Sequence, residues 1–294
     1  MRPSRRAFLG GISAAAGALA LPALGNAAPL ARVKELGVLR VGLYQKNRPW
    51  SWEEDGQVMG IDADIARACA DALGVKTDLA LFPADEEVSD DLRNVVWRGG
   101  LLGFRRCDVM MHVPFDRQFA AQETEVVILA PYYRESFTAA CANDAATDCE
   151  GVPTQFRGKR LAAEIDSIPD FYLVGSFGGI LRPDVGHYTT GYEAVSALGE
   201  GKADIAVATR AQVESAMAGN KANGGADIVP RQGPLPAMLS PGWDIGIAVR
   251  EDSRSLGFRL EDLIHGMAES GQLKDIFARH GVEWRNALAL QPNT

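Results

Sequence analysis

The chain has 294 residues, of which 47% are hydrophobic and 23% are charged, and its formal net charge is −8 at pH 7. This apolar content excludes a disordered chain, and the excess of 38 acidic over 30 basic residues argues against a nucleic-acid-binding protein. Four cysteines in so long a chain exclude a disulfide-dense scaffold, and the length favours one large domain or two smaller ones.

The first residues have the pattern of an export signal. Arg5 and Arg6 are followed by an uncharged stretch, residues 10–24, that is rich in alanine and glycine and ends in small residues suited to cleavage. The paired arginines resemble a twin-arginine signal, while an uncleaved anchor helix is disfavoured by the weak hydrophobicity. Removal of residues 1–27 takes away Arg2, Arg5 and Arg6 and no acid, which changes the charge from −8 to −11. We therefore expect an acidic periplasmic protein without a membrane span.

In the mature chain, apolar β-rich runs alternate with amphipathic helical runs, which predicts α/β units with largely parallel strands. The first half is expected to contain strand 39–43, helix 61–73, strand 79–82, helix 89–98 and strand 108–113. Gly74 is expected to end the first helix, and Ser89 to cap the second.

The same alternation restarts near residue 158. The second half is expected to contain strand 158–163, a helix that opens at Ser167, helix 192–198, strand 203–208, strand 245–249 and helices 256–269 and 273–280. The last strand and its two helices form a return segment, so we expect two lobes between which the chain crosses. In such sheets, ligands bind at the carboxyl ends of the strands, here in a cleft between the lobes.

The cysteines fit an oxidising compartment. Cys141 and Cys149 lie eight residues apart in a turn-rich stretch, which favours a local disulfide. Cys69 falls in a predicted helix and Cys107 just before a predicted strand, so these two residues either pair or remain buried thiols. No spacing of cysteines and histidines suits zinc, and we expect neither metal nor cofactor.

Several short motifs occur in a defined order along the chain. They are LRVG at 39–42, RPWSW at 48–52, GIDADIA at 60–66, CDVM at 107–110, APYY at 130–133, GKAD at 201–204, GIAVR at 246–250 and GQLKDI at 271–276. Taken together, residues 36–284 resemble the family 3 periplasmic solute-binding proteins. No single motif is specific, and the resemblance depends on the ordered set.

This resemblance implies a periplasmic-binding-protein-like fold of two α/β lobes joined by a two-strand hinge, with type II topology. Lobe 1 would comprise residues 30–135 plus 244–294, and lobe 2 residues 138–241. The protein would be a monomer that closes its lobes on a small solute and passes it to an ABC-type permease. Closure would follow from ligand contacts that exist with both lobes only in the closed state.

The contacts that hold an α-amino acid in this family are largely replaced. By resemblance, Gln122 stands where an arginine clamps the carboxylate, and Ala208 and Thr209 stand where an acid takes the ammonium group. Residues 166–169 replace the turn whose amides bind the carboxylate. An unpaired charge in a closed cleft costs on the order of several kcal/mol. We therefore expect a small polar organic solute rather than a standard α-amino acid.

The expected ligand-binding residues form an aromatic wall in lobe 1 and a polar set in lobe 2. They are Tyr44, Trp50, Trp52, His112, Phe115 and Arg117, with Glu164, Ser167 and Thr209. The two tryptophans fit core packing equally well, and His112 fits a buried core histidine. Arg117 is an alternative clamp for an acid.

Two other functions remain open. In its altered clamp and its stretch 131–136, the chain resembles the MoxJ/XoxJ-type accessory proteins of quinoprotein methanol and alcohol dehydrogenases, whose partner would be the dehydrogenase or its cytochrome. A few relatives of this fold are dehydratases, and Glu164 would suit acid–base chemistry if burial raised its pKa. The sequence pairs Glu164 with no nucleophile and contains no GxSxG, HExxH or P-loop motif, so we do not expect an enzyme.

Overall fold

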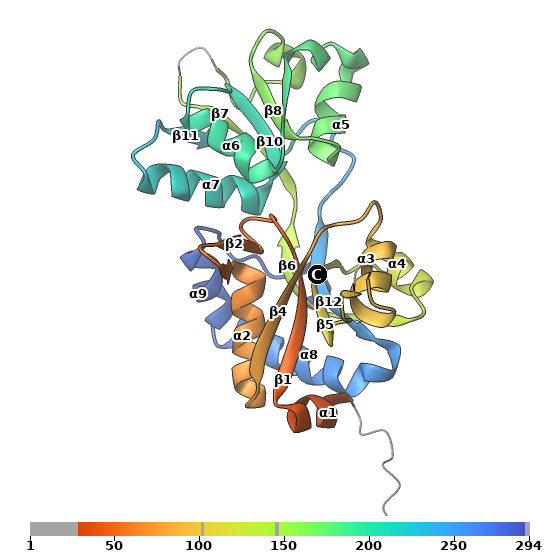
Figure 1. Ribbon diagram of the computed structural model, residues 1–294. Helices are drawn as coiled ribbons and strands as arrows, with labels where there is room; N and C mark the ends of the chain where they lie inside the picture. The colour runs from red at the N-terminus through yellow and green to blue at the C-terminus, as the bar shows by residue number, and fades with distance from the viewer. Residues whose placement is uncertain (1–28, 101–102, 145–146, 292–294) are drawn as a thin grey trace, which may run out of the picture.

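The computed structural model describes residues 29–100, 103–144 and 147–291. It has two lobes, one above the other in Figure 1, and each is a five-stranded sheet with helices on both faces. Lobe 1 holds the first strands of the chain, and lobe 2 is inserted into it. The predicted two-lobed α/β fold is therefore confirmed, whereas the predicted export signal, residues 1–27, lies outside the described residues.

The sheet of lobe 1 has the strand order β4-β1-β5-β12-β6. Its strands are β1 (Val38–Tyr44), β4 (Lys76–Phe82), β5 (Val109–Pro114), β6 (Val126–Glu135) and β12 (Trp243–Arg250). Strand β1 is parallel to β4 and β5, whereas β12 is antiparallel to β5 and β6. The carboxyl ends of β1, β4 and β5 therefore meet at the edge where β6 leaves the sheet for lobe 2 (Figure 1).

The helices of lobe 1 fall on the two faces of this sheet. They are α1 (Pro29–Leu36), α2 (Ile61–Leu73), α3 (Val88–Leu92), α4 (Arg117–Gln122), α8 (Arg254–Glu269) and α9 (Gln272–Arg279). Helices α2, α8 and α9 share one core, which includes Ile65, Leu260 and Phe277. The core of the opposite face is filled by α3 and its π-helical extension η1 (Arg93–Trp97).

Two predicted helix ends in lobe 1 had different outcomes. Gly74 ends α2 in the left-handed region, with a φ of 72°, as expected of a residue without a Cβ. Ser89 does not cap α3, because the helix begins one residue earlier and its N-cap is Glu87. The Ser89 hydroxyl instead donates a hydrogen bond to Glu123 in the segment after α4. The expected cap was therefore wrong.

The sheet of lobe 2 has the order β11-β7-β10-β8-β9. Its strands are β7 (Phe137–Ala142), β8 (Leu161–Glu164), β9 (Val185–Tyr188), β10 (Ile205–Thr209) and β11 (Ile228–Pro230), and its longer helices are α5 (Ile168–Gly175), α6 (Gly191–Gly199) and α7 (Arg210–Ala222). Ser167 caps α5 as predicted, because its hydroxyl accepts the N–H of Asp170. Helix α7 was not predicted, because polar residues interrupt the apolar periodicity of its sequence.

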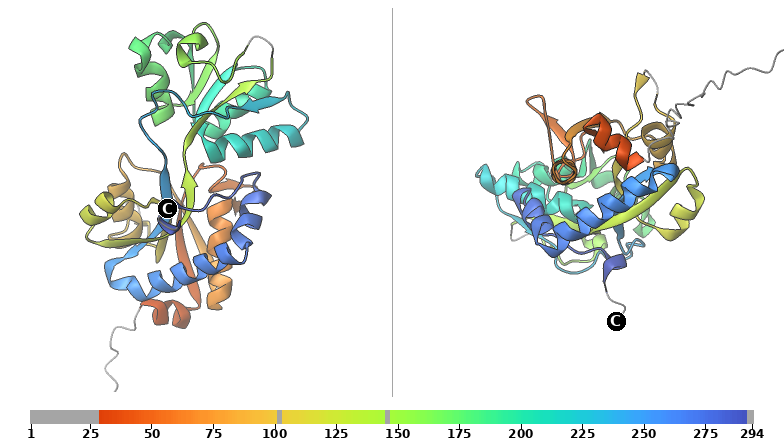
Figure 2. Two further views of the ribbon diagram at one scale, coloured as in Figure 1. Left: turned by 180° about the vertical axis from the view of Figure 1, so that it is seen from behind. Right: turned by 90° about the horizontal axis from the view of Figure 1, so that it is seen from below.

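Two segments connect the lobes. Strand β6 passes through Ser136 into β7, and the chain returns from lobe 2 into β12 (Figures 1 and 2). Glu135, at this crossing, is 1% exposed. Burial raises its pKa to about 7, although the Ser136 N–H and the Thr209 hydroxyl, which bind the carboxylate, lower it. The crossing is therefore marked by a buried carboxyl group.

The cysteines form one disulfide and two thiols. Cys141 and Cys149 are bonded, with their Cα atoms 5.7 Å apart, as expected. Cys69 and Cys107 are free and buried in different cores, and burial raises the pKa of each thiol to about 12. Of the two alternatives for this pair, the structure contains the buried thiols. Within the described ranges, no helix has the length and apolarity needed to cross a membrane.

Candidate functional site

The register of both sheets places the carboxyl ends of their parallel strands at the hinge. In lobe 1, Pro114 at the end of β5 pairs with Ile245 near the start of β12. In lobe 2, Thr209 at the end of β10 pairs with Phe137 at the start of β7, and β8 runs parallel to β10. We call the residues at these strand ends and in the loops after them the interlobe site.

Two of the predicted aromatic residues are held by lobe 1 itself. The Tyr44 hydroxyl donates to Asp91 Oδ2 at 2.7 Å, and burial together with Asp91 raises the pKa of Tyr44. Trp50 is 2% exposed, and its ring centroid lies 4.6 Å from that of His112 and 5.7 Å from that of Phe277. Trp50 is therefore a core residue that supports the ring of His112.

His112 belongs to a polar group that the sequence did not predict. Its Nδ1 lies 3.3 Å from Oδ2 of Asp62, and the Tyr132 hydroxyl donates to Oδ1 of the same carboxylate at 2.6 Å. Asp62 is fully buried at the start of α2. Its place in the motif GIDADIA was visible in the sequence, but nothing there paired it with His112 or Tyr132.

Trp52 takes part in a contact between the lobes. It lies on β2 (Trp52–Glu54), which forms a short hairpin with β3 (Gln57–Met59). The guanidinium carbon of Arg48 is 4.5 Å from the ring centroid of Trp52 and 4.7 Å from that of Tyr192 on α6. Arg48 therefore joins an aromatic ring of each lobe by cation–π contacts, and sequence reasoning missed both Arg48 and Tyr192.

Phe115 and Arg117 follow β5 directly. Phe115 is half-buried against the core under α3, and its N–H donates to the carbonyl of Asp244 at 2.8 Å. Arg117 is exposed on the first turn of α4, which Asp116 caps. Within the described part of the chain, the Arg117 guanidinium has no ion pair or side-chain hydrogen bond, so it is available to an acid.

The three polar residues predicted in lobe 2 all stabilise loops. Glu164 Oε2 accepts the N–H of Gly191 at 2.8 Å, and burial raises the pKa of Glu164. The Ser167 hydroxyl donates to the carbonyl of Glu164 at 2.6 Å, and Thr209 caps α7 by accepting the N–H of Gln212. These groups arrange the starts of α5, α6 and α7 beside the ends of β8 and β10.

Lobe 2 also exposes apolar side chains beside these loops. Ile165, Ile168 and Phe171, in the turn after β8 and the first turn of α5, are 52%, 53% and 59% exposed. Helix α5 lies on the same side of the molecule as α3 and α4 (Figures 1 and 2). Large apolar side chains grouped on a surface mark a place where a ligand or another surface packs. Sequence reasoning did not single out these residues.

The lobes already touch on the opposite side. Helix α7 lies beside the C-terminal segment that follows α9 (Figures 1 and 2). Arg285 of that segment forms an ion pair with Glu214 of α7 at 2.7 Å, and the N–H of Glu283 donates to the same carboxylate at 2.9 Å. Ala218 packs so closely on Gly281 that a Cβ at Gly281 would come within 2.4 Å of it.

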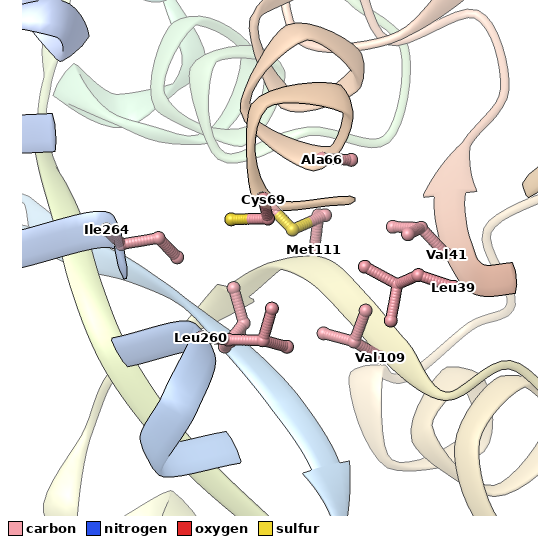
Figure 3. Close-up of a pocket in the computed structure, with 9 residues that line it drawn as sticks. Leu39, Val41, Ala66, Cys69, Val109, Met111, Leu260 and Ile264 are labelled. Carbon is pink, nitrogen blue, oxygen red and sulfur yellow. The ribbon is translucent and has the colours of Figure 1, made fainter. Parts of the chain in front are cut away.

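Two cavities in lobe 1 lie away from the interlobe site. One, of about 10 Å³, is enclosed by apolar side chains of β1, β5, α2 and α8, among them Cys69 and Met111 (Figure 3). It has at most about the volume of one water and no polar lining group to bind it, so it is a packing gap. The other, of about 1270 Å³, is an open basin lined by charged residues such as Arg106 and Asp78. Among the described residues, no group of three His, Cys, Asp or Glu side chains could hold a metal ion.

Comparison with known proteins identifies the fold. No protein-family model matches the chain, and no curated protein matches its sequence. An ancestral cationic amino acid solute-binding protein, a precursor of cyclohexadienyl dehydratase, is 19% identical with a TM-score of 0.63, over 86% of this chain and 99% of its own.

Two further solved structures give the same result. An amino acid ABC transporter substrate-binding protein from Streptococcus pneumoniae, bound to L-arginine, is 19% identical with a TM-score of 0.61, over 86% of this chain and 98% of its own. A cysteine-binding protein from Campylobacter jejuni is 18% identical with a TM-score of 0.58, over 85% and 92%. The chain therefore has the fold of the two-lobed periplasmic binding proteins.

Proposed function

We propose that the protein binds a small polar organic solute between its lobes and passes it to an ABC-type importer in the periplasm. The observation that carries this proposal is the arrangement of the strand ends. In both sheets they lie at the hinge, and only two segments of chain connect the lobes. A ligand held by both sets of loops favours the closed arrangement, because its contacts to both lobes exist only there.

The two lobes contribute different kinds of residue to the proposed binding site. In lobe 1, His112, Phe115 and Arg117 follow or end β5, and Tyr44 and Trp50 hold the His112 ring. In lobe 2, Ser167 and Thr209 begin helices, whose N-termini attract negative charge. We keep a standard α-amino acid out of the proposal because Ala208 and Thr209, at the position of the expected acid, offer no carboxylate for an ammonium group.

The structure favours a structural role for Glu164. Its carboxylate accepts a hydrogen bond from the first residue of α6, which fits a group that fixes the loop before that helix. For this reason we do not propose dehydratase activity, although burial raises the Glu164 pKa in the direction that acid–base chemistry requires. A Glu164→Gln variant keeps an oxygen that can accept the Gly191 N–H and should therefore fold, and neither it nor the wild type should turn over a cyclic, prephenate-like substrate.

The proposed function is tested by melting the purified protein against a broad panel of organic solutes. A solute that binds only the native state stabilises it by about 2.7 kcal/mol at a hundredfold excess over Kd, which raises Tm by several degrees. Arg106→Ala, in the basin far from the interlobe site, is the matched control and should keep the shift. If no solute moves Tm and the protein instead co-purifies with a quinoprotein dehydrogenase or its cytochrome, the accessory role replaces this proposal.

The periplasmic location is proposed on separate grounds. The first 27 residues have the twin-arginine export pattern, and the disulfide between Cys141 and Cys149 fits an oxidising compartment. Fractionation of cells that express the full chain should place a shortened protein in the periplasm. Replacing Arg5 and Arg6 with lysines should leave the unshortened protein inside the cell, and continued export of that variant would contradict a twin-arginine route.

A further inference from the structure

Two β-bulges lie on either side of β12 at the interlobe end of the lobe 1 sheet. The ladders of β12 with β5 and with β6 both shift register within residues 245–248. The extra residues on β5 include His112, with a φ of 63°, and those on β6 include Ala130, with a φ of 52°. Non-glycine residues in this left-handed region are strained, and such strain and bulges concentrate at functional sites, where they redirect side chains.

The bulges bring two polar side chains to one buried carboxylate. His112 from β5 and Tyr132 from β6 reach Asp62 at 3.3 and 2.6 Å, from opposite sides of β12. The carboxylate sits in the first turn of α2, where the helix N-terminus favours negative charge. Asp62 is 0% exposed, and its Oδ2 has no hydrogen-bond partner among the described residues but lies 3.3 Å from Nδ1 of His112, so the imidazole is the polar group that this oxygen faces.

The imidazole is packed on one side and partly exposed on the other. Its Nδ1 is buried, lies 3.3 Å from Asp62 Oδ2 and has no hydrogen-bond partner among the described residues, while Trp50 packs on the ring at 4.6 Å and Tyr44 meets it edge-on at 6.2 Å. The side chain as a whole is 18% exposed. Because Nδ1 is buried beside Asp62, Nε2 is the polar atom of His112 that a ligand can reach.

The polar groups around this atom favour an acidic ligand. Asp62 of α2 and Tyr44 of β1 lie against the ring, the hydroxyl of Tyr132 on β6 shares Asp62 with it, and the Tyr44 hydroxyl is bound to Asp91 of α3. Both of these carboxylates are therefore already engaged within lobe 1. Arg117, which follows β5, is exposed and has no ion pair with any residue that the structure describes. The groups left for a ligand are therefore Nε2 of His112, which donates when the ring is protonated, and the guanidinium of Arg117, which always donates.

We propose that His112 is the polar anchor of the interlobe site and binds the carboxylate of an organic acid. Asp62 positions the His112 ring with the proton on Nδ1. This inference rests on the proposed function and assigns the chemical class of its solute. The acid meets the Nε2–H of the protonated ring, with Arg117 as a second donor. Asp62 is a positioning residue, because it acts on the ligand only through His112.

The position of the ring proton can be measured without any ligand. Imidazole ¹⁵N spectra of the purified protein, which has four histidines, are assigned for His112 by comparison with His112→Gln. We expect the neutral ring of His112 to carry its proton on Nδ1, and Asp62→Asn to remove this preference, because the partner of one ring nitrogen decides which nitrogen is protonated. A neutral His112 with its proton on Nε2 would overturn the positioning role. If Asp62→Asn fails to fold, the wild-type spectrum alone decides.

The ligand class is tested with benzoate and with its neutral isostere benzamide. We expect benzoate to bind more tightly, and His112→Gln to weaken benzoate roughly ten- to a hundredfold while changing benzamide little. Tyr132→Phe, which keeps the Asp62–His112 contact, is the matched control and should retain the wild-type affinity for benzoate.

The outcomes separate this inference from the proposed function. Equal or tighter binding of benzamide, or an unchanged benzoate affinity in His112→Gln, overturns the acidic class and leaves solute binding intact. If neither probe binds and the broad solute panel gives no melting shift, the proposed function is wrong, and the proposed acidic class of ligand is wrong as well. If neither probe binds while a non-acidic solute of the panel does, only the acidic class is overturned.

Discussion

The two lobes bring different surfaces to the interlobe site. Lobe 1 contributes an arrangement that is already buried and connected, in which Trp50 and Tyr44 hold His112 and a buried Asp62 lies behind it. Lobe 2 contributes the starts of three helices and the exposed side chains of Ile168 and Phe171. The difference indicates that the lobe 1 part of the interlobe site is already formed before a ligand binds. The lobe 2 part exposes apolar surface that becomes buried only when a ligand or another surface packs on it.

The largest expected effect comes from removing one aromatic side chain from each lobe. Trp50→Ala should lower the free energy of unfolding by about 3–5 kcal/mol, because it leaves a cavity in the lobe 1 core. Phe171→Ala should change it by less than about 0.5 kcal/mol, because that side chain is 59% exposed. Urea denaturation of both variants measures the two values. Similar losses in the two lobes would contradict the contrast between a preformed and an open surface.

The next effect concerns the carboxyl group between the lobes. Burial raises the pKa of Glu135 to about 7, so folding favours its protonated form. The favourable contribution is complete below the unfolded pKa of about 4.5 and is lost as pH rises through about 7. Glu135→Gln should therefore be more stable than the wild type at pH 8, on the order of a few kcal/mol, and should match it near pH 4.

Thermal or urea unfolding of the wild type and Glu135→Gln across this pH range measures the effect. Glu150→Gln is a suitable control, because Glu150 is a largely exposed carboxyl group of lobe 2 and its pKa is lowered by the Gln232 N–H that it accepts. Glu150→Gln should lose rather than gain stability above pH 5. If the stability difference between the wild type and Glu135→Gln did not depend on pH, Glu135 would not be the buried group described.

The smallest expected effect concerns the contact that joins the lobes through Arg48. Arg48→Ala removes the guanidinium from between Trp52 and Tyr192 and should weaken their association by about 1–2 kcal/mol. Because the lobes are also joined by Arg285 and Glu214, the fold should persist. Small-angle X-ray scattering without a solute should show a larger radius of gyration for this variant. An unchanged radius would mean that the Arg48 contact does not restrain the lobes.

The elements that depend on local pattern could be predicted from the sequence. Helix α2 was expected at residues 61–73 and occupies them, because its apolar face is regular and Gly74 stops it. Helix α7 was missed because its buried face is made of small and polar residues such as Ala211, Gln212 and Ser215. The cap expected at Ser89 was wrong, because that hydroxyl finds a distant partner in Glu123.

The candidate site could be predicted only in part. His112 was expected at the end of its strand, and it lies there. Its partners Asp62 and Tyr132 are 50 and 20 residues away along the chain, and they meet it through bulges that depend on the pairing of β5 and β6 with β12. The same limit applies to Trp50, whose contact with Phe277 requires α9 to pack on lobe 1. Long-range pairing of this kind leaves no local signal in the sequence.

The closing of the lobes on a solute is tested most directly by small-angle X-ray scattering of the purified protein. The solute with the largest melting shift is added at saturating concentration, and the radius of gyration is compared with that of the free protein. We expect the radius to decrease with the solute, and an acidic solute to be needed at a higher concentration for the same decrease in His112→Gln. A wild-type radius that stays constant while the solute is bound would contradict the closing of the two lobes on their ligand.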